Sequence, residues 1–447
     1  MVRNVIARKP VASSAVMAIV VGGVALLWHL LACIESPMAY SPNGKDLAFV
    51  TMEPYGDGDD VLLAGKHVYR LMVISEGKKL RTLEETTSEM LSAPAFSADG
   101  KYLCYLRIRL VTENTLARLK EHVQKWQAWQ SEMAGFAWSD VAQATTTSAP
   151  AAFANVVDMA LPSFNELLEW QQSLSSTPAL PTMLVERDAQ SGEVLSTTAV
   201  DVPGLNSPGG LLVSYALIRP QYAAKSRWVY YGGGNVAFAV EPTKSECRVV
   251  AAPAIAAALS PDGKLLAVLQ EKALGFIETS GERATYRRLE NPISPAGLAW
   301  ADEKTLVALE PVTGDMDVQL HFFDPTGALL RSVSVHLPAH GKQEKENSGA
   351  LAVAPDGERF VVAFENDVFF LKGSGALARH WHSNDERLAQ PTFAPDWQRV
   401  AFKVMREKEN EPLRAVAIAF FTPAGEEVSR VPIPVAVVPA SQPAGQR

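Results

Sequence analysis

The chain has 447 residues and a formal net charge of −8 at pH 7. Because binding to nucleic acid needs a basic surface, this charge gives no support to a nucleic-acid partner. Gly and Pro number 29 each, a content that suits a turn-rich β fold better than an all-α fold.

The first 33 residues have the pattern of an export signal. Basic residues within positions 1–9 precede an uncharged run at 11–32, and this run is long enough to span a bilayer. It ends in LLAC, which resembles the lipobox of bacterial lipoproteins and implies lipidation of Cys33, although Leu31 stands where a small residue is usual. The alternative is an uncleaved membrane anchor. Both interpretations place the rest of the chain outside the cytoplasm, in the periplasm or cell envelope of a bacterium.

A tight turn followed by an apolar strand recurs along the chain. In LSPDGKLLAVL, Pro presets φ, Asp caps the turn with its side chain and Gly accepts a positive φ. The residues that follow have the aliphatic and aromatic character of a buried strand. A weaker copy at 299–309 lacks the Gly. The clearest copies are YSPNGKDLAFV (40–50), FSADGKYLCYL (96–106), LSPDGKLLAVL (259–269), VAPDGERFVVAF (353–364) and FAPDWQRVAFKV (393–404).

The spacing of these copies predicts seven units. Gly263 and Gly357 are separated by two units of about 47 residues, with the weak copy between them. Gly100 and Gly263 are also two units apart once a helical, strand-poor segment at 113–180 is set aside. A degenerate unit is therefore expected near 225–250, where two strand patterns flank a Gly-rich turn and a third follows.

A second phrase, a Gly turn between two strand runs, follows the first in most units, as in DPTGALLRS (324–332). Each unit then contains four strands, and four-stranded repeats of about 40–50 residues are typical of propeller blades. The sequence predicts an all-β fold, a seven-bladed β-propeller of four-stranded blades at 37–434. It also predicts a helical hairpin at 113–180 inserted in the second blade, and a Pro-rich tail at 435–447.

The turn-plus-strand phrase resembles the TolB-like (PD40, WD40-like) β-propeller repeat. The resemblance covers 38–432 apart from the helical insertion, and it implies the propeller fold. The GH…WD pair of the WD40 family is absent, and the α/β domain that precedes the propeller in TolB proteins has no counterpart in this sequence. The resemblance therefore concerns the repeat, and it is a poor guide to function.

In each predicted blade, tight turns join the first strand to the second and the third strand to the fourth. Because the strands are antiparallel, these tight turns lie on one face of the propeller, and the longer connections all lie on the opposite face. Loops on a rigid scaffold carry binding, so we expect a protein or peptide partner on this face, near the insertion. Aromatic residues are favoured interface anchors, although in the insertion they could instead pack the hairpin onto the propeller. The candidates are Tyr55, Trp126, Trp129, Trp138 and Trp170.

Signals of catalysis or of a cofactor are sparse. Asp57, Asp59 and Asp60 could ligate Ca²⁺, which prefers clustered oxygen atoms, but without EF-hand spacing a polar turn is the alternative. His380 and His382 share one side of a predicted strand, with no third metal ligand evident. No other cofactor and no catalytic residue are predicted, and a GxSxG nucleophile motif is absent.

These patterns favour an envelope-anchored, non-catalytic scaffold that binds a protein or peptide and reaches the membrane through its N-terminus. The alternative is an enzyme or a carbohydrate-binding module that uses the central channel of the propeller, because the fold hosts both.

Overall fold

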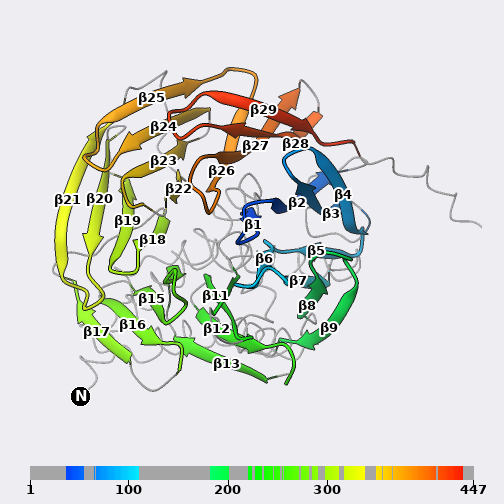
Figure 1. Ribbon diagram of the computed structural model, residues 1–447, viewed down its shortest axis with the longest axis horizontal. Helices are drawn as coiled ribbons and strands as arrows, with labels where there is room; N and C mark the ends of the chain where they lie inside the picture. Colours follow the sequence, from blue (N-terminus) through cyan, green and yellow to red (C-terminus); the bar gives the residue numbers. More distant parts are fainter. Residues whose placement is uncertain are drawn as a thin grey trace, which may run out of the picture.

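The computed structural model is a ring of β-sheets around a central axis (Figure 1). It describes residues 37–54, 65, 67–109, 182–200, 220–223, 227–233, 236–244, 246–251, 254, 256–270, 273–280, 284–289, 297–311, 317–337, 349–354, 356–364, 366–408 and 411–435. Seven antiparallel sheets follow one another in chain order, and each is one blade. The predicted all-β, seven-bladed propeller is therefore confirmed, whereas the predicted helical hairpin at 113–180 lies outside the described residues.

The first three blades are built as follows. Blade 1 contains β1 (Ala39–Tyr40), β2 (Asp46–Pro54), β3 (His67–Ser75) and β4 (Lys79–Thr86). Blade 2 contains β5 (Glu89–Leu91), β6 (Ala95–Phe96), β7 (Tyr102–Arg109), β8 (Thr182–Asp188) and β9 (Val194–Ala199). Blade 3 contains β10 (Gln221–Tyr222), β11 (Val229–Gly233), β12 (Val236–Glu241) and β13 (Glu246–Ala251), and it is the degenerate unit expected near 225–250.

The other four blades have four strands each. Blade 4 contains β14 (Ala256–Leu259), β15 (Leu265–Gln270), β16 (Ala273–Glu278) and β17 (Ala284–Arg288). Blade 5 contains β18 (Gly297–Asp302), β19 (Thr305–Pro311), β20 (Asp317–Phe323) and β21 (Leu329–His336). Blade 6 contains β22 (Gly349–Val353), β23 (Arg359–Phe364), β24 (Asp367–Lys372) and β25 (Leu377–His382). Blade 7 contains β26 (Arg387–Phe393), β27 (Val400–Lys408), β28 (Glu411–Phe421) and β29 (Glu427–Pro432).

The turn between the first and second strands owes its shape to local side-chain hydrogen bonds. In blade 4 the Ser260 hydroxyl donates to Asp262 Oδ1 at 2.7 Å, and the same oxygen accepts the Lys264 backbone N–H at 3.1 Å. Gly263 follows with φ 66°. Blade 5, which lacks the Gly, uses a shorter turn in which Asp302 pairs directly with Thr305. The recurrent aspartates of the first phrase thus serve as turn caps.

The turn between the third and fourth strands explains the glycine of the second phrase. Gly375 has φ 82°, in the left-handed region that favours glycine. A Cβ atom at this position would lie 2.4 Å from Val333 Cγ1, on the outer strand of the preceding blade. The glycine therefore allows the turn of blade 6 to pack directly on blade 5, and the second phrase carries an inter-blade contact as well as a turn.

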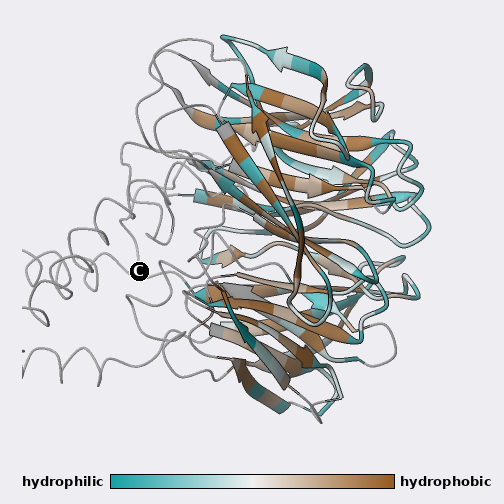
Figure 2. Cartoon of the chain, turned by 90° about the vertical axis from the view of Figure 1, so that its left-hand side faces the viewer, coloured by the Kyte–Doolittle hydropathy of each residue, from teal (hydrophilic) through white to brown (hydrophobic). Residues whose placement is uncertain are grey.

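The hydrophobic core is a ring of interfaces between neighbouring blades. The second and third strands are almost wholly buried, as β3 and β23 show, and they form the apolar layer in the middle of the ring in Figure 2. Six clusters of buried apolar side chains join the blades, and each contains residues from at least two adjacent blades. Burial of the apolar area between sheets is thus what stabilises the ring.

Blade 1 is formed by the first four described strands and blade 7 by the last four, so these two blades share no strand. The ring is therefore closed by side-chain packing between the two sheets. Phe49 and Ile74 of blade 1 pack with Ile418 and Phe420 of blade 7. Lys403 adds a polar contact, because its buried ammonium group donates to the Val50 carbonyl oxygen at 2.9 Å. Closure therefore depends on this one interface between the two ends of the described chain.

Candidate functional site

The two faces of the ring carry different kinds of connection. Antiparallel strands place the first-to-second and third-to-fourth turns on one face, the short-turn face, at the right of Figure 2. The second-to-third and blade-to-blade connections belong to the opposite face, the long-loop face. The largest interval between paired strands, 110–181, separates β7 from β8 and so leaves blade 2 from the long-loop face.

The predicted site residues all lie outside the described part of the chain. Their roles therefore stay predictions; these residues are Cys33, Tyr55, Asp57, Asp59, Asp60, Trp126, Trp129, Trp138 and Trp170. Within the described ranges, no helix is long and apolar enough to cross a membrane.

The base from which the 110–181 segment leaves blade 2 is well defined. Ile108 and Thr182 are paired across β7 and β8, and their side chains are only 2% and 1% exposed. On the other side of β7, the short strand β5 pairs with the last three residues before the segment. Among the described strands, such an additional strand occurs in blade 2 alone, and the sequence did not predict it. The segment thus starts and ends side by side on a packed, three-stranded base.

A charged network joins this base to blade 1. The Glu84 carboxylate on β4 lies 2.8 Å from Arg107 Nη2 and 2.5 Å from Arg187 Nη2, and it also accepts a hydrogen bond from the Tyr105 hydroxyl. Burial alone would raise the pKa of Glu84, but these three donors outweigh burial and lower it. Arg107 also pairs with Glu89 at 3.2 Å. The end of β7 is therefore fixed by ion pairs on both sides.

The described inner strands offer few groups for chemistry in the channel. Their sequences are dominated by small and apolar residues, as in AAAL (256–259) and GALAV (349–353). Along these strands the charged side chains are Glu89, Asp302 and Arg387, and histidine is absent. Glu89 is already paired with Arg107. A convergent pair of carboxylates, which hydrolysis of glycosides requires, is therefore not formed by the described inner strands.

The two histidines of the HWH sequence share a carboxylate that the sequence had not revealed. His380 Nε2 and His382 Nδ1 lie 2.6 Å and 2.9 Å from the same oxygen, Oδ1 of buried Asp367 on the neighbouring strand. The His380 ring also stacks on Phe369, with the ring centroids 4.6 Å apart. Among the described residues, no three His, Cys, Asp or Glu side chains are placed to hold a metal ion. The cluster is best described as a hydrogen-bonded link between β24 and β25.

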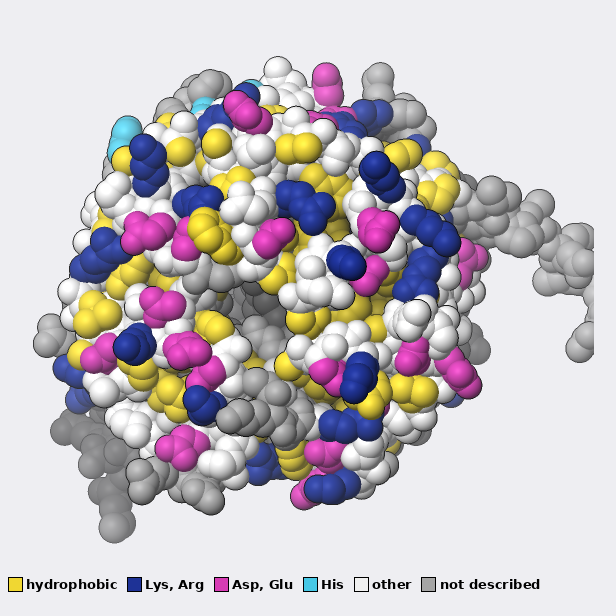
Figure 3. All heavy atoms as spheres, in the orientation of Figure 1, with side chains coloured by type: hydrophobic (Ala, Val, Ile, Leu, Met, Phe, Trp, Pro, Cys, Tyr) yellow, Lys and Arg dark blue, Asp and Glu magenta, His cyan; other side chains and the backbone are white. Residues whose placement is uncertain are grey.

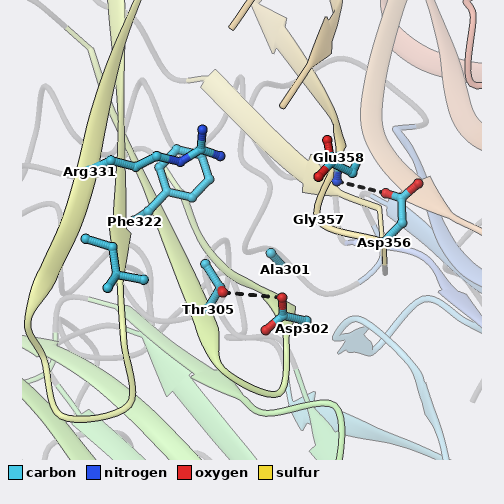
Figure 4. A pocket seen from close by; sticks show the side chains of 9 residues that line it. Ala301, Asp302, Thr305, Phe322, Arg331, Asp356, Gly357 and Glu358 are labelled. Atoms are coloured by element: carbon cyan, nitrogen blue, oxygen red, sulfur yellow. Dashed lines mark hydrogen bonds between the residues drawn. The ribbon is translucent and has the colours of Figure 1, made fainter. Parts of the chain in front are cut away.

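A pocket opens on the short-turn face between blades 5 and 6 (Figure 4). Its volume is about 200 Å³, small beside the usual 300–1,000 Å³ of small-molecule sites. The Arg331 guanidinium lies over the Phe322 ring, with Cζ 4.1 Å from the centroid. Figure 3 shows acidic and basic side chains interspersed over this face. The lining residues are Ala301, Asp302, Thr305, Phe322, Leu330, Arg331, Asp356, Gly357 and Glu358.

The pocket was not predicted from the sequence because its residues come from two blades. One nearby signal was present in the sequence, however. In FAPDWQRV, Trp397 stands where other copies of the turn have Gly, and the structure places it beside Arg359, next to the pocket. The replacement of the usual Gly by Trp397 in an exposed turn was thus the sequence signal that could have pointed to the surface around this pocket.

Comparisons with known proteins identify no family for this chain. No protein-family model matches the chain, and no curated protein matches its sequence. One of 852 matching chains of solved structures belongs to a mitotic checkpoint complex. That chain is 12% identical, the match covers 57% of this chain and 73% of that chain, and the TM-score is 0.39. A likeness this weak supports no inference about function.

Proposed function

We propose that the protein is a non-catalytic β-propeller scaffold that binds a protein or peptide partner through its long-loop face and the segment at 110–181. The observation that carries this proposal is the base of that segment. Ile108 and Thr182 are buried and paired, and β5 and the Glu84 network support the same strand end. A rigid base lowers the entropic cost of presenting a binding element, which is the general advantage of a preorganised interface.

The finer parts of the proposal rest on the sequence. The basic, apolar and LLAC pattern that ends at Cys33 supports anchoring at the membrane, with the propeller in the periplasm or cell envelope. The four tryptophans of the segment supply side chains of the type that anchors protein interfaces. The turn-plus-strand phrase supports membership in the TolB-like repeat group.

Deletion of 113–180 tests the proposal. Because the segment's ends are side by side, a short Gly-Ser linker can replace it without strain on β7 and β8. Full-length and deleted chains are expressed in the organism that encodes them, cross-linked in the cells, and purified in detergent. We expect a defined partner with the full chain that is lost on deletion, while the urea midpoint of unfolding is unchanged.

The matched control keeps the segment but replaces Trp126, Trp129, Trp138 and Trp170 by Ser. If these residues anchor the partner, this variant also loses it. A partner recovered equally by the intact and the deleted chain would contradict the role of the segment. The absence of any partner with a folded, intact chain would contradict the scaffold function itself.

A further inference from the structure

The first turn of blade 7 carries tryptophan in a backbone conformation that favours glycine. Gly263 and Gly357 occupy the equivalent position of their turns with φ 66° and 67°, and Trp397 adopts φ 52°. For a residue with a Cβ atom, this left-handed conformation has a free-energy cost that glycine avoids. The indole is 39% exposed, so burial recovers only part of that cost. Residues that break a local rule without a stabilising reason are candidates for function.

Trp397 is held at the edge of the pocket by a cation. The Arg359 guanidinium lies over the indole, with Cζ 4.4 Å from the ring centroid. Arg359 Nε also donates to Asp356 Oδ2 at 2.9 Å, and Asp356 lines the pocket between blades 5 and 6. The indole, the ion pair and the pocket are therefore contiguous and come from three consecutive blades. We call them together the Trp397 surface.

The charges of the pocket favour a cationic occupant. Asp356 is paired with Arg359. Asp302 and Glu358 are exposed and form no ion pair among the described residues, although Asp302 accepts hydrogen bonds within its own turn. Arg331 is the basic residue among those that line the pocket (Figure 4). Leu330 is 56% exposed and supplies an apolar wall that suits an aliphatic stem, whereas Phe322 is buried beneath the Arg331 guanidinium. A volume of about 200 Å³ suits one long side chain better than a drug-sized molecule.

We propose that the Trp397 surface binds a Lys or Arg side chain from an extended segment of a partner protein. The basic head group lies between Asp302 and Glu358, and its stem lies along Leu330. Arg331 is left to donate to a backbone carbonyl of the segment. An adjacent apolar residue of the segment contacts the Trp397 indole, as exposed tryptophans do at interfaces. The site lies on the short-turn face, opposite the strand ends at Arg109 and Thr182 that flank the 110–181 interval, so it is independent of the function proposed above.

Selection from a random peptide library tests this proposal. The library is displayed on phage and selected on the full-length chain in detergent, and peptides that also bind the Trp397→Gly variant are removed. We expect the remaining peptides to share a Lys or Arg next to an apolar or aromatic residue. One such peptide, labelled with a fluorophore, then gives dissociation constants by anisotropy. Glu358→Gln and Asp302→Asn, which retain the side-chain shape, should each weaken binding about two- to fivefold, because both carboxylates are exposed.

Two exposed positions on blade 7 provide matched controls. Val428→Ser removes an exposed apolar side chain and Glu426→Gln removes an exposed carboxylate, both away from the pocket, and neither should change the dissociation constant. Trp397→Gly should keep or raise the urea midpoint of unfolding, because glycine adopts the positive φ of this position without the free-energy cost that a residue with a Cβ has.

Several results would overturn the proposal. The first is that the selection enriches no peptide whose binding depends on Trp397. The second is that the enriched peptides contain neither Lys nor Arg. The third is that Glu358→Gln leaves the dissociation constant of the peptide unchanged. Argininamide that competes at the same concentration as the peptide would instead identify a small-molecule site. If Trp397→Gly lowers the urea midpoint, the tryptophan is structural, and the two carboxylate variants then decide whether the pocket binds.

Discussion

Replacement of Gly375 by Ala should weaken the contact between blades 5 and 6. The new Cβ atom would lie 2.4 Å from Val333 Cγ1 and 3.2 Å from Val335 Cγ2, so the turn or the strand must shift. Overpacking of this kind costs about 1–3 kcal/mol, and the positive φ adds about 1–2 kcal/mol for a residue with a Cβ. The expected loss in the free energy of unfolding is therefore about 2–5 kcal/mol.

Gly77 offers a matched control, because it occupies the corresponding turn of blade 1 with φ 67°. A Cβ there would meet only Arg399 Nη1 at 3.6 Å, which is ordinary van der Waals contact. Gly77→Ala should thus cost only the conformational part, about 1–2 kcal/mol. Equilibrium urea unfolding of both variants measures the difference.

A second variant isolates the steric part. In a Val333→Ala background the atom that the new Cβ would strike is gone, so Gly375→Ala should cost about as much as Gly77→Ala. Equally small losses for Gly375→Ala and Gly77→Ala in the otherwise unchanged chain would show that no steric conflict exists at Gly375. The absence of rescue by Val333→Ala would show that Val333 is not the source of the conflict.

Two further predictions concern charged groups. Lys403→Met should lower the free energy of unfolding by about 1–3 kcal/mol, because the Val50 carbonyl loses its buried donor at the ring closure; a urea midpoint equal to or above that of the parent would contradict this. Burial opposes ionisation of Glu84, but the hydrogen bonds from Arg107, Tyr105 and Arg187 outweigh it and hold its pKa below the ordinary 4.5. Its contribution to stability is therefore present above pH 4.5 and is lost as the pH falls through the lowered pKa. Urea midpoints between pH 6 and pH 3 should fall less in Glu84→Gln than in the parent, and parallel curves would refute the prediction.

The number of blades could be predicted because each blade is a local unit. The turn residues Ser260, Asp262 and Gly263 bond to one another within a few positions of the chain, so their pattern is visible in the sequence. Spacing then located the degenerate blade 3, whose own turns are poorly marked. Local turn chemistry and regular spacing are thus sufficient for the architecture of a repeat protein.

The contacts that define the sites could not be predicted in the same way, because they join residues distant in sequence. Glu84 meets Arg187 across more than one hundred positions, and Asp356 of blade 6 lines a pocket with Asp302 of blade 5. The partner of His380 and His382 was missed although it lies on the adjacent strand, because the register that pairs Asp367 with His382 is set by the turn between them. The additional strand β5 had no sequence signal, since three residues are too few for a pattern.

The central claim, that the propeller is a protein-binding scaffold, is tested most directly by photo-cross-linking in living cells. A photoreactive amino acid replaces Trp129 in the 110–181 segment, Gln398 beside Trp397, or Val428 on an outer strand as a control. We expect discrete cross-linked partners from Trp129 and from Gln398, identified by mass spectrometry, and none from Val428. Folded protein at normal levels without a specific cross-link from either of the first two positions would rule out a protein-binding scaffold.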